Sequence, residues 1–149
     1  MISGDVIEYR KMSPDDLKQV SEIEKRIFSE PWSQAGFAAS LNSKDTVYVS
    51  AVKNGRVVGY CGLLQSLEEA DITNVAVEET SRGQGIGQAM LTSLMEFGKE
   101  RGISRFTLEV RKSNQAAIHL YEKLGFESAG IRKRFYQKPE EDAVIMWTR

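Results

Sequence analysis

The amino-acid sequence predicts a mixed α/β domain built on one central sheet. Segments rich in β-branched residues alternate with segments of helical periodicity, and glycines and asparagines mark the turns between them. The chain has 149 residues, of which 41% are hydrophobic and 28% charged, with a formal net charge of -1. This length and composition are typical of one globular domain, so we expect a single domain over residues 1–149.

The N-terminal half predicts a strand, two helices and then three strands. Ser13 is suited to cap the first helix, because Pro14 fits the first helical position and Asp16 the capping-box position. Asn54-Gly55 lies between two apolar segments and is a strong β-hairpin signal. We expect strands at 6–11, 47–52, 57–67 and 71–77, and helices at 13–28 and 34–41.

The C-terminal half predicts alternating helices and strands. Gly102 and Gly125 follow two helical segments and are expected to end them. We expect helices at 85–101 and 114–124, and strands at 106–111, 126–132 and 143–147. The resulting order, β-α-α-β-β-β-α-β-α-β-β, predicts helices packed on one mixed sheet.

The composition excludes several kinds of chemistry. The chain has one cysteine, Cys61, and one histidine, His119, so it can form neither an intrachain disulfide nor a multi-cysteine or multi-histidine metal site. We expect Cys61 to be a buried apolar residue, His119 to be exposed on a helix, and the protein to need no metal. Catalysis must then depend on carboxylates, hydroxyls, backbone amides or a bound cosubstrate.

Charge and hydropathy limit the partners. The near-neutral charge gives no general attraction to nucleic acid. The first residues include no apolar signal segment, and the longest apolar stretch, 57–64, is far shorter than the ~20 residues that span a bilayer. We therefore expect a cytoplasmic protein without membrane or direct nucleic-acid contacts. We also expect a monomer, or a weak dimer that pairs through the final strands.

The most informative motif is the glycine-rich turn Arg82-Gly83-Gln84-Gly85-Ile86-Gly87. It connects an expected strand to an expected helix. Glycines there let the backbone approach a ligand, and the first amides of the helix favour an anion. One interpretation of the turn is therefore a phosphate site. The other is that its glycines serve only the packing of the helix on the sheet.

Among phosphate-binding motifs, the turn fits one. A Walker A loop requires lysine and then serine or threonine after its last glycine, whereas Gln88 and Ala89 follow Gly87. A dinucleotide-binding G-x-G-x-x-G motif needs a third glycine where Gln88 stands. The pattern Arg/Gln-x-x-Gly-x-Gly/Ala of acetyl-CoA sites is satisfied by Arg82, Gly85 and Gly87.

Four motifs follow one another along the chain: residues 74–77, the glycine-rich turn, residues 108–114 and residues 117–126. Together they resemble the GNAT superfamily of acetyl-CoA-dependent N-acetyltransferases. Within it, the chain is most similar to the RimI type, bacterial enzymes that acetylate the N-terminal alanine of a small-subunit ribosomal protein. This finer resemblance rests on the Asn74 strand, on Glu30-Pro31-Trp32-Ser33, on the sequence Leu-Glu-Val-Arg at 108–111, and on residues 131–143.

The resemblance implies a GNAT fold and a cosubstrate site. Two parallel strands, at 71–77 and 106–111, are expected to splay apart, with about four helices around the sheet and the pantetheine arm of acetyl-CoA between the two strands. The pyrophosphate is expected on the amides of the glycine-rich turn, and the asparagine that starts the following helix on the pantetheine. The implied acetyl-CoA ligands are Val75, Ala76, Val77, Arg82, Gly83, Gln84, Gly85, Ile86, Gly87, Gln88, Asn114 and Tyr121.

The resemblance also implies a catalytic pair. Glu109 is expected to act as general base, and Tyr121 as the acid that protonates the departing thiolate. From the residues alone, Glu109 can instead be a strand-edge carboxylate paired with Arg111 or Lys112. Tyr121 lies on the apolar stripe of its helix and can instead be a core tyrosine.

The expected acceptor is the N-terminal α-amine of a ribosomal protein that begins with alanine. An α-amine has a pKa of about 7.7–8.0, against about 10.4 for lysine, so a modest base suffices near neutral pH. Pro31, Trp32 and Tyr136 are the expected acceptor contacts. The alternatives are a GNAT enzyme that acts on lysine side chains or small amines, and a noncatalytic acetyl-CoA-binding sensor or assembly module.

Overall fold

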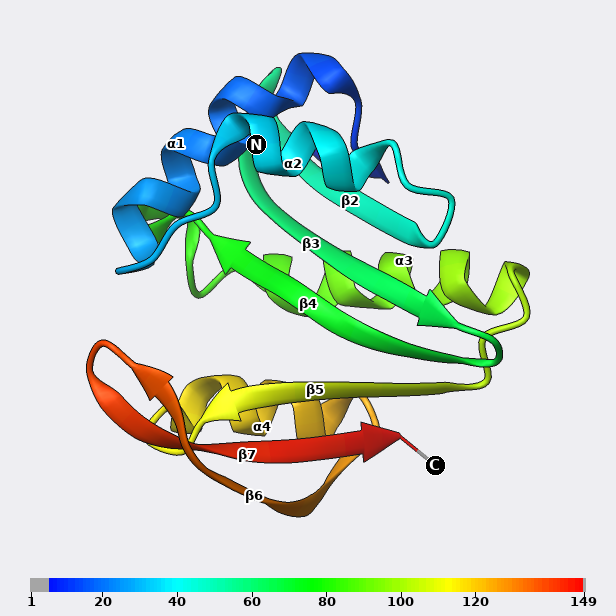
Figure 1. Cartoon of the computed structure of the whole chain (residues 1–149). Helices are drawn as coiled ribbons and strands as arrows, with labels where there is room; N and C mark the ends of the chain where they lie inside the picture. Colours follow the sequence, from blue (N-terminus) through cyan, green and yellow to red (C-terminus); the bar gives the residue numbers. More distant parts are fainter. Residues whose placement is uncertain (1–5, 149) are drawn as a thin grey trace.

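The computed structural model describes residues 6–148, which form a seven-stranded mixed sheet in the order β1-β2-β3-β4-β5-β7-β6 (Figure 1). The strands are β1 (Ile7–Lys11), β2 (Thr46–Lys53), β3 (Arg56–Ser66), β4 (Glu69–Val77), β5 (Arg105–Arg111), β6 (Phe126–Gln137) and β7 (Glu140–Thr148). The helices are α1 (Leu17–Ile27), α2 (Gln34–Leu41), α3 (Ile86–Glu100) and α4 (Gln115–Lys123), with 3₁₀ turns η1 (Pro14–Asp16) and η2 (Glu79–Ser81). The expected mixed α/β fold is confirmed.

Helices cover both faces of the sheet. α1 and α2 pack on one face, over a core cluster that includes Val20, Phe37 and Tyr60. α3 and α4 pack on the other face, over a larger cluster that includes Met90 and Phe106. Figure 1 shows α1 and α2 at the top of the view and α3 and α4 behind the strands. Within residues 6–148, no helix is long and apolar enough to cross a membrane.

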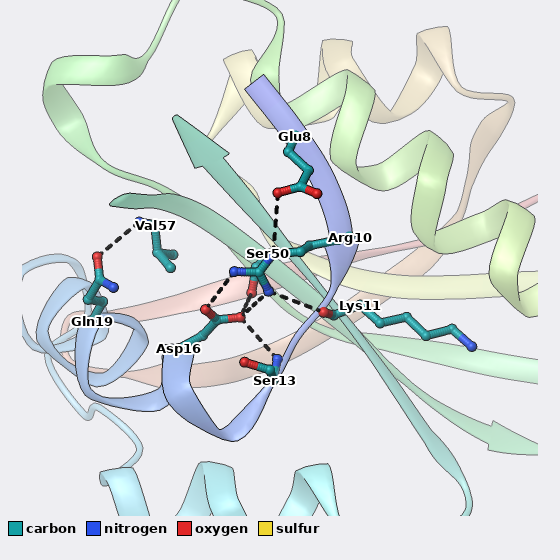
Figure 2. A network of polar contacts seen from close by, with 8 residues as sticks. All are labelled: Glu8, Arg10, Lys11, Ser13, Asp16, Gln19, Ser50 and Val57. Atoms are coloured by element: carbon teal, nitrogen blue, oxygen red, sulfur yellow. Dashed lines mark hydrogen bonds and ion pairs between the residues drawn. The ribbon is translucent and has the colours of Figure 1, made fainter. Parts of the chain in front are cut away.

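The first helix begins where the capping signals predict. The Asp16 carboxylate accepts a hydrogen bond from the Ser13 backbone N–H at 3.0 Å, although the first turn is 3₁₀ and α1 itself starts at Leu17. The same carboxylate is 3% exposed and accepts two bonds from Arg10, at 2.7 and 3.0 Å, and one from Ser50 Oγ at 3.0 Å. Figure 2 shows how this network joins β1, β2 and the start of α1.

The final hairpin is longer than expected. The sequence predicts strands at 126–132 and 143–147, whereas β6 and β7 both continue to a turn of two residues. The charged residues 132–134 do not end β6, because a bulge there turns the chain toward solvent on the open edge of the sheet. Arg134, with a φ of 53°, donates its backbone N–H to Asp142 Oδ1 at 2.9 Å. The other expected elements differ by at most two residues at each end, counting η1 with α1.

The parallel strands β4 and β5 separate along their length. They pair only over residues 69–71 of β4, opposite 105–107 of β5. Beyond Asp71, β4 continues to Val77 and β5 to Arg111 without pairing to each other, and Figure 1 shows them diverging toward their C-terminal ends. The splay that the resemblance implies is therefore confirmed.

A β-bulge bends β4 where it leaves β5. Gly62 and Leu63 of β3 pair with Asn74 and Ile72 of β4, so Thr73 has no counterpart on β3. Bulges bend a strand and increase its twist. The bulge therefore supplies the bend that the splay requires.

Candidate active site

The splay leaves backbone groups of both strands without partners in the sheet. β3 pairs with the outer edge of β4, and β7 with the outer edge of β5, so within residues 6–148 no strand pairs with the facing edges at 72–77 and 108–111. An extended ligand can occupy such an edge as an added strand does. Val75, Ala76 and Val77 lie on this open part of β4.

The glycine-rich turn leads from β4 into α3 and carries a row of free amides. Gly83 and Gly85 have φ values of 80° and 77°, and a Cβ at either position would meet no atom within 4 Å. The backbone conformation, and not packing, therefore requires these glycines. Within the described part of the chain, the N–H groups of residues 83–88 donate no hydrogen bond, and the first amide bonded at the start of α3 is that of Ala89. Such amides form an anion site.

Two contacts fix the shape of the turn. A Cβ at Gly87 would lie 3.2 Å from Leu120 Cδ2, so this glycine lets α4 approach α3 closely. The packing interpretation thus applies to Gly87. Arg82 Nε donates to Val77 O at 3.1 Å and closes the turn onto the end of β4.

Glu109 lies on the open part of β5. Its side chain is 30% exposed, and its buried Oε2 lies 3.1 Å from Arg132 Nη1. The two groups form an ion pair without hydrogen-bond alignment, since Oε2 accepts no hydrogen bond within residues 6–148. The sequence alternative of a paired strand-edge carboxylate holds with a different partner: among the described residues Glu109 pairs with Arg132, and Arg111 binds the turn between β6 and β7. Glu109 is thus paired with Arg132 through its buried oxygen, and the exposed part of its carboxylate faces the open end of β5.

Tyr121 lies on α4 with its ring in the core. It is 7% exposed and packs against Phe126, with ring centroids 5.9 Å apart. Burial raises the pKa of Tyr121 well above its usual value, and nearby Cys61 and Tyr136 raise it further. The hydroxyl is therefore protonated at neutral pH and available as a proton donor.

Tyr136 on β6 connects these two groups. Burial raises the pKa of Tyr136, and the neighbouring Glu109 carboxylate raises it further. Tyr136 in turn raises the pKa of Tyr121, so Tyr136 lies near both side chains. Arg111 lies over the Tyr136 ring, 4.3 Å from its centroid, and donates to both carbonyls of the β6–β7 turn at 2.9 and 3.2 Å. Arg111 therefore fixes this turn at the end of β5.

The loop between α1 and α2, residues 28–33, meets the β6–β7 turn. Ser29 Oγ donates to Lys138 O at 2.7 Å, and Lys138 Nζ lies 3.8 Å from a Glu30 carboxylate oxygen. Figure 1 shows both segments at the end of the molecule where β4 and β5 diverge. Pro31 and Trp32 in the loop are exposed, Trp32 by 39%. The loop and the turn therefore border the open ends of the strands.

Asn114 caps the helix that follows β5. Its Oδ1 accepts a hydrogen bond from the Ala117 backbone N–H at 3.2 Å. The carbonyl of this side chain is therefore occupied by the helix, and its amide nitrogen is the group suited to bind a ligand.

Cys61 and His119 lie as predicted. Cys61 is fully buried, and burial raises the pKa of its thiol, so it offers no thiolate nucleophile to the site. His119 is exposed on α4. Among residues 6–148, no group of three or more His, Cys, Asp or Glu side chains is arranged to hold a metal ion. A metal-free reaction stays a prediction.

Residues 17–126 match the acetyltransferase (GNAT) family, and this segment includes the splayed strands, the glycine-rich turn and α4. The chain belongs to this family. The superfamily resemblance drawn from the four motifs is therefore confirmed, and the protein is an N-acetyltransferase by family.

Curated GNAT relatives are similar over nearly their whole length. The chain is 40% identical to the putative ribosomal protein bS18-alanine N-acetyltransferase of Bacillus subtilis (strain 168), over 93% of this chain and 92% of the relative. It is 38% identical to the ribosomal protein bS18-alanine N-acetyltransferase of Escherichia coli (strain K12), over 88% of this chain and 89% of the relative. It is 33% identical to N-alpha-acetyltransferase RimI of Mycobacterium tuberculosis, over 88% and 85%. The resemblance to the RimI type is confirmed.

Solved structures show the same GNAT architecture. The crystal structure of the ribosomal-protein-S18-alanine N-acetyltransferase from Escherichia coli has a TM-score of 0.87 and 34% identity, covering 96% of this chain and 93% of that one. Ard1 from Thermoplasma volcanium has a TM-score of 0.86 and 28% identity, covering 95% of each chain. NAA60 from Arabidopsis thaliana in complex with acetyl-CoA, at 20% identity, has a TM-score of 0.87 over 95% and 97% of the two chains and shows the fold alone.

Glu109, Tyr121 and Tyr136, from three different elements of the acetyltransferase, lie near one another, but sequence reasoning missed two arginines. Arg111 and Arg132 belong to the motifs of the resemblance, and Arg111 is also a possible partner of Glu109, but the sequence assigns neither of them its observed contact. Arg111 binds the β6–β7 turn and Glu141, and Arg132 binds Glu109. Local sequence holds no signal for such contacts, because the partners lie more than twenty residues away in the chain. The catalytic roles of Glu109 and Tyr121 stay predictions.

Proposed function

We propose that this acetyltransferase transfers an acetyl group from acetyl-CoA to the N-terminal α-amine of the alanine that begins ribosomal protein bS18. The observation that carries the proposal is the 38–40% identity, over about nine-tenths of each chain, to enzymes named for this reaction. The open strands, the free amides and the pair Glu109 and Tyr121 supply a site with suitable chemistry.

Acetyl-CoA is proposed to bind between the splayed strands. The extended pantetheine arm pairs with the open edge of β4 at Val75, Ala76 and Val77. The pyrophosphate accepts hydrogen bonds from the amides of residues 83–88, where the dipole of α3 also favours negative charge. The amide nitrogen of Asn114 donates to the pantetheine from the start of α4. The structure of NAA60 with acetyl-CoA supports this cosubstrate for the fold.

The transfer needs one proton acceptor and one proton donor. The amine nitrogen attacks the carbonyl carbon of the thioester, and Glu109 accepts the proton that the amine loses, directly or through a water molecule. As the C–N bond forms, the C–S bond breaks, and Tyr121 donates its hydroxyl proton to the CoA thiolate. The buried position of the Tyr121 hydroxyl beside the open strands, and not its raised pKa, supports this role, because the thiolate offers the hydroxyl a partner. The acetyl group passes directly to the amine, without an acyl-enzyme on the buried Cys61.

The acceptor is proposed to enter between the α1–α2 loop and the β6–β7 turn. Pro31 and Trp32 contact the first residues of the acceptor, and the Tyr136 hydroxyl binds its backbone. The hydrogen bond from Ser29 joins the loop to the β6–β7 turn, so the entrance is closed on that side. A closed entrance suits the free end of a peptide better than the middle of a chain. We further propose that the enzyme works in the cytoplasm as a monomer or weak dimer, without nucleic-acid contacts.

The test is acetylation of matched peptides, located by fragmentation mass spectrometry. Purified protein and acetyl-CoA are incubated with bS18 N-terminal peptides that begin with alanine, serine or methionine, and with an alanine peptide whose α-amine is blocked. Each peptide includes one lysine. We expect acetylation of the free α-amine only, fastest for alanine. Acetylation of the lysine in the blocked peptide would favour a side-chain acceptor, and acetyl-CoA binding without acetylation would favour a noncatalytic module.

A further inference from the structure

A buried carboxylate lies beneath the acceptor loop, which we define as residues 28–33, and has no part in the chemistry above. Glu24, on α1, is 4% exposed. Its Oε1 accepts a hydrogen bond from the Tyr60 hydroxyl at 2.6 Å, and its Oε2 accepts one from the Trp32 backbone N–H at 3.0 Å. Burial of a carboxylate is unfavourable unless hydrogen bonds compensate for lost water. These two bonds therefore stabilise the buried carboxyl group of Glu24 in this position.

The bond to Trp32 holds the middle of the acceptor loop from inside. Pro31 has no backbone N–H, and Ser33 begins α2, where its side chain accepts a hydrogen bond from the Gly36 N–H at 3.0 Å. On the outer side, Ser29 Oγ bonds the β6–β7 turn at 2.7 Å. Glu24 thus ties the loop to α1, while Ser29 ties it to the turn.

The same carboxylate also holds the aromatic side chains next to the loop. Trp32 packs on Phe37 with ring centroids 5.3 Å apart, and Phe37 packs edge-on against Tyr60 at 5.7 Å. Tyr60 is fully buried on β3 and pairs with Ala76 of β4. Glu24 therefore bonds both ends of the series Trp32, Phe37 and Tyr60, and this series extends from the acceptor loop to the open strand.

We propose that Glu24 is a positioning residue for the acceptor peptide. By holding the Trp32 N–H and the Tyr60 hydroxyl, its carboxylate sets the place of the acceptor loop relative to β4. The inference rests on the proposed function, because it takes this loop as one wall of the acceptor site. Glu24 bonds no residue of the glycine-rich turn, so we expect a Glu24 variant to retain acetyl-CoA affinity.

The test is Glu24→Gln, which keeps the size of the side chain. A glutamine has one acceptor oxygen, so it can accept from the Trp32 N–H or from the Tyr60 hydroxyl but not from both; if Trp32 keeps the oxygen, the Tyr60 oxygen accepts from the glutamine nitrogen and its own buried proton is left unpaired. We expect the KM for an alanine-starting peptide to rise roughly tenfold with little change in kcat, because an unpaired buried donor weakens the loop. We expect acetyl-CoA affinity to stay at the wild-type value and hydrogen exchange of segment 28–33 to become faster.

Asp16→Asn is the matched control. Like Glu24, Asp16 is buried, accepts a hydrogen bond from a backbone N–H at 3.0 Å and lies among the N-terminal elements. None of its hydrogen bonds reaches the acceptor loop (Figure 2). This variant should lose stability and keep the wild-type KM and the wild-type exchange of segment 28–33, measured well below its unfolding temperature. A KM that rises equally in both variants would reduce Glu24 to a general stability role and overturn the proposal.

The outcomes separate the two proposals. Failure of the wild-type protein to acetylate any α-amine rejects the proposed function, whereas exchange of segment 28–33 still tests the Glu24 contact itself. Unchanged KM and unchanged exchange in Glu24→Gln reject the positioning role. If Glu24→Gln does not fold, Tyr60→Phe replaces it. That variant removes one donor and keeps the carboxylate, so a smaller rise in KM supports the proposal and an unchanged KM rejects it.

Discussion

At the scale of single residues, the proposed proton acceptor and the proposed proton donor are side chains on different elements. Glu109 projects from the open end of β5, with an oxygen that accepts no hydrogen bond within the described residues. Tyr121 comes from α4, where burial raises its pKa and keeps its proton in place. Tyr136 raises the pKa of Tyr121, and the Glu109 carboxylate raises the pKa of Tyr136. This division of roles leads to two separate predictions.

Tyr121→Phe should lower kcat by about 100-fold or more, because the departing thiolate loses its proton donor. Acetyl-CoA affinity should stay close to wild type, since the ring that packs on Phe126 remains. Steady-state kinetics and calorimetric titration with acetyl-CoA measure the two quantities. Tyr9→Phe, on strand β1, also removes a tyrosine hydroxyl, but far from the site, and should leave kcat and acetyl-CoA affinity unchanged. Full turnover in Tyr121→Phe would exclude the acid role.

Glu109→Gln should lower the rate most at pH values below the pKa of the acceptor amine, about 7.7–8.0. Below that pH most of the amine carries the proton that the base must remove, and above it the amine is already neutral. The pH profile of kcat/KM measures this effect. Glu69→Gln makes the same charge change at the paired end of β4 and should leave the profile unchanged. An equal fall in rate at every pH would argue against Glu109 as the base.

At the scale of elements, the glycine-rich turn and the β4 bulge create the site. The bulge at Thr73 bends β4 away from β5, and the turn then presents its free amides at the start of α3. Neither feature contributes a reactive side chain. Both shape the backbone so that a long, negatively charged cosubstrate has an edge and an anion site.

Gly85→Ala should weaken acetyl-CoA binding roughly tenfold, because a Cβ disfavours the φ of 77° that aims the amides. Gly102 offers a matched control, with a φ of 86° and no atom within 4 Å of an added Cβ, at the other end of α3. Both variants should lower the free energy of unfolding by about 1 kcal/mol. Acetyl-CoA titration of both checks the prediction. Equal affinities would mean that the turn does not hold the pyrophosphate.

Signals between neighbouring residues predicted the helices and strands well. Features that depend on contacts between distant segments were not predictable from the sequence. The start of the first helix and the end of α3 were predictable, because each depends on residues close in sequence. These are the capping pair Ser13 and Asp16, and the glycine after α3. The β4 bulge depends on pairing with β3 and left no local trace. Glu24 shares the buried side of α1 with Ile23, but periodicity does not reveal that a carboxylate there finds partners in Trp32 and Tyr60. The catalytic pair was predicted by resemblance, since spacing alone left each residue a structural alternative.

At the scale of the whole molecule, the Asp16 network joins the N-terminal strand to the rest of the sheet (Figure 2). Burial alone would raise the pKa of Asp16. Hydrogen bonds from Arg10, the Ser13 N–H and Ser50 together outweigh this effect and hold the pKa of Asp16 below its usual value. The charged form is therefore more favourable in the folded state. Its stabilisation is complete at pH values above the unfolded pKa of about 3.9 and is lost as pH falls through the folded-state pKa.

Asp16→Asn should lower the free energy of unfolding by about 2 kcal/mol at pH 7, because the Arg10 ion pair and two further bonds are weakened. The difference between variant and wild type should shrink as pH falls below about 4. Urea unfolding at pH 7 and at pH 3 measures it. A difference that grows in acid would contradict the lowered pKa of Asp16.

The most direct test of the account is a crystal structure with a bisubstrate conjugate, in which CoA is linked to the α-amine of an alanine-starting peptide. We expect the pantetheine on the open edge of β4, the pyrophosphate on the amides of 83–88, and the sulfur within about 3.5 Å of the Tyr121 hydroxyl. The linked nitrogen should lie within reach of Glu109, directly or through one water molecule. A conjugate bound outside the splay, or one whose reacting atoms lie far from both side chains, would contradict the account.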